Sequence, residues 1–240
     1  MADIQFEDPR IVALYDPLDP VREDLDHYVA MVAEFDASSI LDIGCGTGTF
    51  ASLLAASGLD VVGVDPAAAS LAIARRKPSA DRVRWIQSNA TDLPPLQVDL
   101  VTMTGNVAQV FLGDDEWNAV LRVARHSLRP GGRIVFEVRD PSQRAWECWT
   151  KRESLTRALV PHIGVVESWT EVGSVAGQLV TFTTTFNVGR QIFTSESTLR
   201  FRSRDDIEVS INSAGLSLVE VRDAPDRPGL EFVFIAELGG

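Results

Sequence analysis

A hydrophobic stretch that runs directly into three closely spaced glycines constrains this chain more than any other feature. The segment is Ile40-Leu-Asp-Ile-Gly-Cys-Gly-Thr-Gly-Thr-Phe50, with glycines at 44, 46 and 48. Residues 39–43 predict a buried strand, and a helix is expected from about residue 47 to residue 56. Glycines at such a junction allow a tight turn and let a ligand approach the backbone. The free N–H groups at the start of the helix can bind polar ligand atoms. This segment therefore predicts a ligand site at a strand-to-helix turn.

Strand-like and helix-like segments alternate through the first 140 residues. Further strands are predicted at residues 61–64, 83–87, 98–103 and 133–138, and further helices at residues 66–76 and after Asp114, the expected N-cap. Such alternation predicts a parallel sheet with helices on both sides. Ahead of the first strand, the apolar spacing predicts a helix over residues 19–35, with Asp19 as its cap and Pro20 in its first turn.

After residue 140 the pattern becomes rich in β-strands. Strands are expected at residues 163–172, 179–188 and 192–202, with a hairpin turn at Gly189-Arg190, and a helix near 205–214 and strands 217–222 and 231–236 then return to the sheet. A length of 240 residues suits one α/β domain with an insertion. We predict a single domain with four parts: an N-terminal helical segment (1–38), a cofactor-binding core (39–140), a β-rich substrate cap (141–203) and a return to the sheet (204–240).

An acidic residue at the end of the second predicted strand indicates what the glycine loop binds. Asp65 follows Gly44 by 21 residues (65 − 44). An acid at this position can accept hydrogen bonds from both hydroxyls of a ribose. The pair predicts a nucleoside cofactor with a free 2′-hydroxyl, but it does not distinguish one such cofactor from another.

Four segments in order resemble the motifs of class I S-adenosylmethionine-dependent methyltransferases. Leu41-Asp-Ile-Gly-Cys-Gly-Thr-Gly48 resembles their first motif and Val62-Gly-Val-Asp-Pro66 their acidic second motif. Ser88-Asn-Ala-Thr-Asp-Leu-Pro94 is similar to their adenine-binding segment, and Leu128-Arg-Pro-Gly-Gly132 to the turn before their fifth strand. The resemblance covers about residues 39–140, and the β cap resembles those of bacterial small-molecule methyltransferases. It implies a three-layer Rossmann-like sandwich with a mostly parallel seven-stranded sheet and an inserted antiparallel β cap.

The same resemblance implies S-adenosyl-L-methionine as cofactor, S-adenosyl-L-homocysteine as product, and a set of residues around them. Gly44 and Gly46 would pass under the methionine and the sugar, Asp65 would hold the ribose, and Asn89, where the family usually has Asp, would accept from the adenine amine. The cofactor-binding residues implied in full are Tyr15, Gly44, Cys45, Gly46, Asp65, Pro66, Asn89, Ala90, Thr104, Gly105 and Gln109. Tyr15 would close over the site. Arg139, Arg144, Trp146 and Trp149 are the candidates for substrate contact, and the sequence identifies no catalytic residue.

The composition limits which partners the protein can bind and where in the cell we expect it. A net charge of −12 opposes a nucleic-acid surface, and no apolar run approaches the roughly 18 residues of a membrane span. The acidic N-terminus lacks the layout of a secretion signal, so we expect a cytoplasmic protein. Cys45 and Cys148 show neither a disulfide framework nor metal-ligand spacing, and no metal is expected. His27 and His126 are expected on the surface. Whether the chain is a monomer or a homodimer is left open.

The function predicted is metal-independent methyl transfer, by in-line displacement, to an oxygen or nitrogen of a small molecule. A protein methyltransferase and a catalytically silent, cofactor-binding partner subunit are the alternatives. A nicotinamide-dependent oxidoreductase is less favoured, because its fingerprint needs a small residue three places beyond the second glycine. Thr49 stands at that position, and the segment 88–94 would have no role in such an enzyme.

Overall fold

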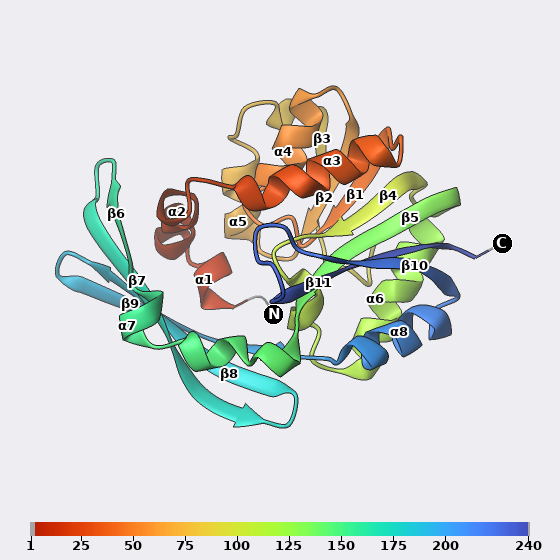
Figure 1. Ribbon diagram of the computed structural model, residues 1–240. Helices are drawn as coiled ribbons and strands as arrows, with labels where there is room; N and C mark the ends of the chain where they lie inside the picture. The colour runs from red at the N-terminus through yellow and green to blue at the C-terminus, as the bar shows by residue number, and fades with distance from the viewer. Residues whose placement is uncertain (1–2, 240) are drawn as a thin grey trace.

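The computed structural model describes residues 3–239 and shows two separate sheets, the larger at the right and the smaller at the lower left of Figure 1. Residues 1, 2 and 240, which the predicted segments include, lie outside the described residues. The larger sheet has the strand order β10-β11-β5-β4-β1-β2-β3. Its strands are β1 (Ser39–Ile43), β2 (Asp60–Asp65), β3 (Val83–Gln87), β4 (Val98–Met103), β5 (Leu128–Arg139), β10 (Leu216–Asp223) and β11 (Glu231–Leu238). Strands β1 to β5 are parallel, while β11 runs antiparallel to both neighbours.

Helices cover both faces of this sheet because each buries an apolar side. On one face α6 (Asp114–Ser127) and α8 (Arg204–Ser213) pack over β4, β5 and β11, with Trp117 and Leu121 of α6 fully buried. On the other face lie α3 (Asp26–Glu34) and α4 (Thr49–Ala56), whose Tyr28 and Phe50 belong to a second buried cluster. The short α5 (Ala68–Ala74) follows β2. The predicted three-layer, mostly parallel sandwich is confirmed.

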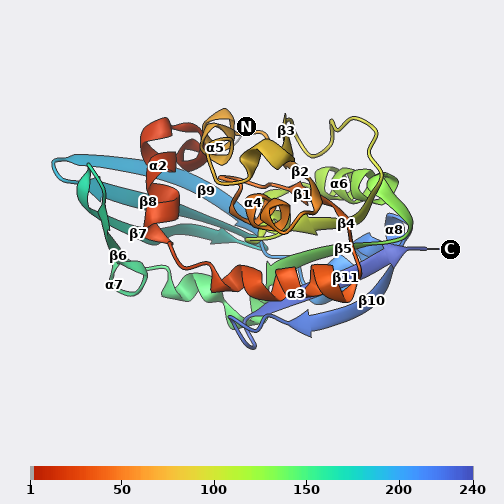
Figure 2. The same ribbon diagram turned by 90° about the horizontal axis from the view of Figure 1, so that it is seen from above.

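The second sheet is the inserted antiparallel cap. It consists of β6 (Thr156–Val160), β7 (Gly164–Ala176), β8 (Leu179–Val188) and β9 (Gln191–Arg200), paired in that order. The 3-10 helices η4 (Pro141–Gln143) and η5 (Ala145–Cys148) and the helix α7 (Lys151–Ser154) lead into it. Two N-terminal helices, α1 (Ile4–Glu7) and α2 (Pro9–Leu18), lie against this sheet, where Ile11 and Leu14 pack on Val166 and Phe186 (Figure 2). Strand β6 is not among the strands predicted from the sequence.

The N-terminal helix predicted over residues 19–35 is wrong in its start and in its cap. Asp19 is the C-cap of α2, and the chain then passes through the 3-10 helix η1 (Glu23–Leu25) before α3 begins at Asp26. Arg22 pairs with Asp24 at 2.8 Å, and Val21 is 64% exposed. The buried apolar repeat therefore begins only at Leu25, and the residues before it connect two separate helices.

Two smaller predictions are also corrected. Asp114 is the first residue of α6, and Gly113 is its N-cap. His27 is not on the surface: its side chain is 11% exposed, because its ring packs against Tyr28 at 4.0 Å and its Nδ1 lies 3.9 Å from Asp226. His126 is exposed, as expected. None of the helices between residues 3 and 239 is long and apolar enough to cross a membrane.

Candidate functional site

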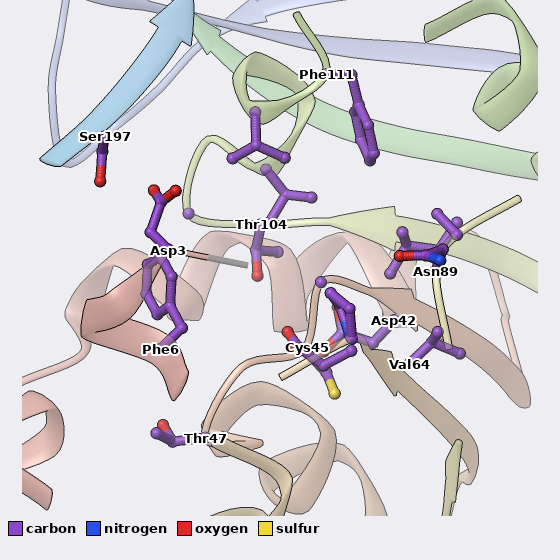
Figure 3. Close-up of a pocket in the computed structure, with 18 of the residues that line it drawn as sticks. Asp3, Phe6, Asp42, Cys45, Thr47, Val64, Asn89, Thr104, Phe111 and Ser197 are labelled. Atoms are coloured by element: carbon purple, nitrogen blue, oxygen red, sulfur yellow. The ribbon is translucent and has the colours of Figure 1, made fainter. Parts of the chain in front are cut away.

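A cavity of about 460 Å³ opens at the carboxyl ends of the parallel strands (Figure 3). Its floor comes from the loops that follow β1, β2, β3 and β4. Residues of α1, α2 and β9 form the opposite wall. The carboxyl ends of strands in an open α/β sheet are where ligands bind in such folds. The cavity therefore lies between the sheet that carries the glycine loop and the cap.

The three glycines of the loop after β1 are needed for different reasons. All have positive φ: +72° at Gly44, +54° at Gly46 and +75° at Gly48. A Cβ at Gly44 would lie 2.6 Å from Val107, and one at Gly48 would lie 2.5 Å from Trp85. At Gly46 an added Cβ would meet no atom of the described residues within 4 Å. Gly44 and Gly48 are thus required by packing and backbone, whereas Gly46 faces open space.

Asp65 ties the ends of β1 and β2 together. Its carboxylate accepts the N–H of Gly46 at 2.8 Å through one oxygen and the N–H of Ala67 at 2.8 Å through the other. The residue is 8% exposed, and burial raises the pKa of its carboxyl group. Each oxygen still has a lone pair for another donor. Because Asp65 also lines the cavity, its two oxygens can accept from adjacent hydroxyls of a ligand.

The loop after β3 forms one end of the cavity. Ser88, Asn89 and Ala90 line it, and Pro66 contributes from the end of β2. The amide nitrogen of Asn89 donates to Asp92 at 3.4 Å, which leaves the amide oxygen available to accept. Figure 3 places Asn89 at the end of the cavity away from Asp3.

Asp42, inside the first motif, lies in the floor of the cavity and was not singled out from the sequence. It is 1% exposed and accepts the hydroxyl of Thr102 at 3.0 Å. Burial is the largest cause that raises the pKa of Asp42, to about 7, and the nearby Asp65 raises it further. Its place directly after Leu41, within the quoted motif, was the signal that could have identified it.

Arg22 was also missed, because it stands outside every motif. It is the one basic residue among the described residues that line the cavity. Its Nη2 donates to Asp24 at 2.8 Å, and this hydrogen bond raises the pKa of the guanidinium. Only the folded chain brings this part of the N-terminal segment to the glycine loop, so no spacing in the sequence indicates it.

Tyr15 lies on α2 and lines the cavity from the side of the cap. The next residue, Asp16, accepts the hydroxyl of Thr47 at 2.7 Å and pairs with Lys77 at 2.7 Å. These contacts fix α2 to the part of the molecule that carries the glycine loop. Tyr15 is 43% exposed and can contact a ligand that enters from this side.

The turn after β4 is fixed from below by buried carboxylates. Gly105 and Asn106 have φ of +70° and +61°. The N–H of Asn106 donates to Glu137 at 3.0 Å, and its side-chain amide donates to Glu231 at 3.2 Å. Tyr28 donates its hydroxyl to Glu137. This network holds Thr104 and Gly105 against the cavity.

The structure does not bring all the predicted site residues to the cavity. Gly46 and Gln109 are not among its lining residues. Gln109 is buried and accepts Arg139 Nη1 at 3.0 Å. Arg144, Trp146 and Trp149 line a separate, open hollow of about 440 Å³ beside β7. The guanidinium of Arg139 lies 5.6 Å from the ring centroid of Trp149, outside both lining sets.

Residues 3–239 show neither an activated cysteine nor a cluster of metal ligands. Burial raises the pKa of the Cys45 thiol well above its usual range, so it is not an activated nucleophile. Cys45 and Cys148 are both free. The described residues contain no group of three or more His, Cys, Asp or Glu side chains that could hold a metal ion.

Comparisons with known proteins agree with this architecture. Residues 40–132 match a family model described as a methyltransferase domain. The chain is 32% identical over 148 residues to the cypemycin N-terminal methyltransferase of a Streptomyces species, covering 60% of each chain. It is 42% identical over 111 residues to the demethylmenaquinone methyltransferase of Clavibacter sepedonicus, covering 44% of this chain and 42% of that one. The matched part therefore spans about half the length of these curated relatives.

A solved structure extends the likeness to almost the whole chain. It is an S-adenosylmethionine-dependent methyltransferase from Clostridium acetobutylicum ATCC 824, with a TM-score of 0.75 and 18% identity. The match covers 96% of this chain and 98% of that one. At this identity the likeness concerns the fold, and it includes the cap as well as the larger sheet.

Proposed function

We propose that this chain, whose residues 40–132 match a methyltransferase domain, is a class I, S-adenosylmethionine-dependent methyltransferase and transfers a methyl group to an oxygen or nitrogen of a small molecule. The cofactor, when bound, supplies a methyl group already activated by its sulfonium. The chain's own residues then have three tasks: to bind the donor, to align the acceptor and to exclude water.

The polar groups of the cavity fit the parts of this donor. Asp65 offers two carboxylate oxygens for the ribose hydroxyls, while Asn89, Ala90 and Pro66 form the end suited to adenine. Arg22, the single cation of the described lining, suits the carboxylate of the methionine part. We propose these residues, together with Gly44, Cys45, Thr104, Gly105 and Tyr15, as the cofactor site. Gly46 and Gln109 would act from outside the lining, Gly46 through the N–H that it donates to Asp65.

The proposed acceptor is small because the cavity is bounded on both sides. The glycine loop and the turn after β4 form one wall, and α1, α2 and β9 form the other. A net charge of −12 also disfavours a nucleic-acid acceptor. We further propose that the transfer needs no metal and that the protein acts in the cytoplasm. Arg139, Arg144, Trp146 and Trp149 could contact only the part of an acceptor that extends beyond the cavity.

The observation that carries the proposal is Asp65, which two backbone N–H groups anchor at the floor of the cavity, where Arg22 is the one basic residue of the described lining. The test is a calorimetric titration of the chain with S-adenosylhomocysteine, with NADH as the parallel control. Binding of S-adenosylhomocysteine alone is expected. Binding of NADH alone would support an oxidoreductase, and binding without methylation of any acceptor would favour a silent partner subunit. A chain without residues 1–18 should bind more weakly if α1 and α2 complete the site.

A further inference from the structure

We infer that the acceptor is an amine, held at the cap side of the cavity by the carboxylate of Asp3 and by the adjoining rings of Phe6 and Tyr15. This inference rests on the proposed methyl transfer and names the chemical class of its acceptor. It depends on no residue of the four motifs, because Asp3 and Phe6 come from α1 and its N-cap and Tyr15 comes from α2. Tyr15 also belongs to the proposed cofactor site, so it would lie where donor and acceptor meet.

The position of Asp3 separates it from the proposed donor site. In Figure 3 its carboxylate projects toward Ser197 of β9, with the Phe6 ring beside it, and Thr104 lies to its right. Asn89, at the adenine end, lies on the opposite side of the same view. The ring centroids of Phe6 and Tyr15 are 6.2 Å apart, at an interplanar angle of 59°. One carboxylate and two aromatic rings thus belong to the wall of the cavity that α1, its N-cap and α2 form.

Hydrogen bonds to both halves of the molecule hold α1 in this place. The backbone N–H of Gln5 donates to Ser195 at 3.1 Å, and its side-chain amide donates to Ser197 at 3.3 Å. On the other side, Ser70 of α5 donates its hydroxyl to the carbonyl of Phe6 at 3.0 Å. Because α1 is held from two sides, by β9 and by α5, Asp3 and Phe6 are presented to the cavity at a defined position.

The charges around this position favour a cationic or hydrogen-donating group. Arg22 is the only base in the described lining and already pairs with Asp24, whereas the lining includes five acids: Asp3, Asp42, Asp65, Glu116 and Glu196. The carboxylate of Asp3 accepts no hydrogen bond from any residue that the structure describes, so its oxygens are available. Aromatic rings attract ammonium groups through their faces, and a carboxylate binds them by charge-assisted hydrogen bonds. An anionic acceptor would instead meet like charge.

The reaction that follows is balanced without a further reagent. An ammonium acceptor first loses one proton to solvent, which leaves a lone pair on nitrogen. That lone pair forms the new N–C bond to the methyl carbon while the C–S bond breaks, and its electrons stay on sulfur to give the neutral thioether. The methylated nitrogen carries the positive charge, and Asp3 stabilises that charge as it develops.

A second possibility is that Asp3 binds the amino group of the donor. The variant Asp3→Asn distinguishes the two, because S-adenosylhomocysteine has that amino group but no acceptor. The matched control is Glu7→Gln, which removes the same charge from the same helix at an exposed residue outside the cavity lining. We expect both variants to bind S-adenosylhomocysteine within about twofold of the unmodified chain, as is usual for changes that remove no contact. A loss of tenfold or more in Asp3→Asn alone would assign Asp3 to the donor and overturn the inference.

Turnover of matched acceptors completes the test. The probes are cyclohexylamine, cyclohexanol and cyclohexanecarboxylate, then benzylamine, benzyl alcohol and benzoate, then glucosamine, glucose and glucuronate, each with S-[methyl-³H]adenosylmethionine. We expect methylation within the amines, with KM raised about tenfold or more by Asp3→Asn, less by Phe6→Leu and not by Glu7→Gln. The inference fails if an alcohol or carboxylate exceeds its matched amine, if Asp3→Asn behaves like Glu7→Gln, or if no amine reacts while S-adenosylhomocysteine still binds. Absence of S-adenosylhomocysteine binding by the unmodified chain would instead refute the proposed function itself.

Discussion

Replacing Asp65 by alanine tests the proposed ribose site most directly. The substitution removes both carboxylate oxygens from the cavity while the rest of the lining is unchanged. A hydrogen bond to a charged group contributes about 1.5–3 kcal/mol, so the loss of one net ribose contact should weaken S-adenosylhomocysteine binding roughly 10- to 150-fold. Calorimetric titration of Asp65→Ala and of the unmodified chain measures this ratio.

The same substitution has a cost in the free protein. Asp65 accepts two backbone N–H groups, and Ala67, which donates one of them, is fully buried. An unpartnered buried donor costs about 1–3 kcal/mol, whereas the N–H of the half-buried Gly46 can turn to water. A domain of this kind is stable by roughly 5–15 kcal/mol, so the variant should fold but unfold at lower urea concentration. Affinity must therefore be measured under conditions where the variant is folded.

Asp60→Ala is the matched control. Asp60 lies at the other end of β2, is exposed and does not line the cavity. It should leave both the affinity and the unfolding midpoint unchanged. If folded Asp65→Ala binds S-adenosylhomocysteine as tightly as Asp60→Ala does, the ribose does not lie at Asp65, and the proposed orientation of the cofactor is wrong.

Three further predictions follow from the packing and the charges. Because burial raises the pKa of Asp42 to about 7, the free energy of unfolding should fall as pH rises from about 4 through 7. Urea titrations of Asp42→Asn should show a weaker dependence of this free energy on pH. An unchanged dependence would contradict the raised pKa of Asp42. Gly48→Ala places a Cβ 2.5 Å from Trp85, whereas the Cβ of Gly46→Ala meets open space among the described residues. Gly48→Ala should therefore lower the thermal unfolding midpoint more than Gly46→Ala does. Equal losses would show that the positive φ alone causes the destabilisation. Turnover should persist in a chelator, and a loss that magnesium restores would refute metal independence.

The part of the site that the sequence predicts is the part built from neighbouring segments. The glycine loop and Asp65 are joined by a hydrogen bond across only 19 residues, from Gly46 to Asp65. The backbone fixes both positions: the turn after β1 needs glycines, and the end of β2 directs the side chain of Asp65 toward that turn. The strands of the larger sheet were also predictable from local sequence, because each buried strand is a short apolar run between turn residues.

The remaining site residues depend on contacts that no local pattern encodes. Arg22 lies at the start of the helix wrongly predicted over residues 19–35, and Asp3 precedes α1, which was not predicted. The apolar residues of α2, Ile11 and Leu14, pack against the cap, which lies far along the sequence. Strand β6 was missed since it is short and mostly exposed, so its pattern shows no buried face.

The contacts of the two proposed halves of the site span different distances along the sequence, so substitutions can change one half without the other. The proposed donor half is held by contacts such as those of Asp65, which join the loop after β1 to the end of β2 and the N-cap of α5. The acceptor half is joined by the hydrogen bonds from Gln5 to Ser195 and Ser197, across 190 and 192 residues. Substitutions in α1 or β9 therefore alter the acceptor wall without touching any donor contact. Under the proposed function, a search for acceptor specificity should therefore begin with α1 and β9 before the glycine loop.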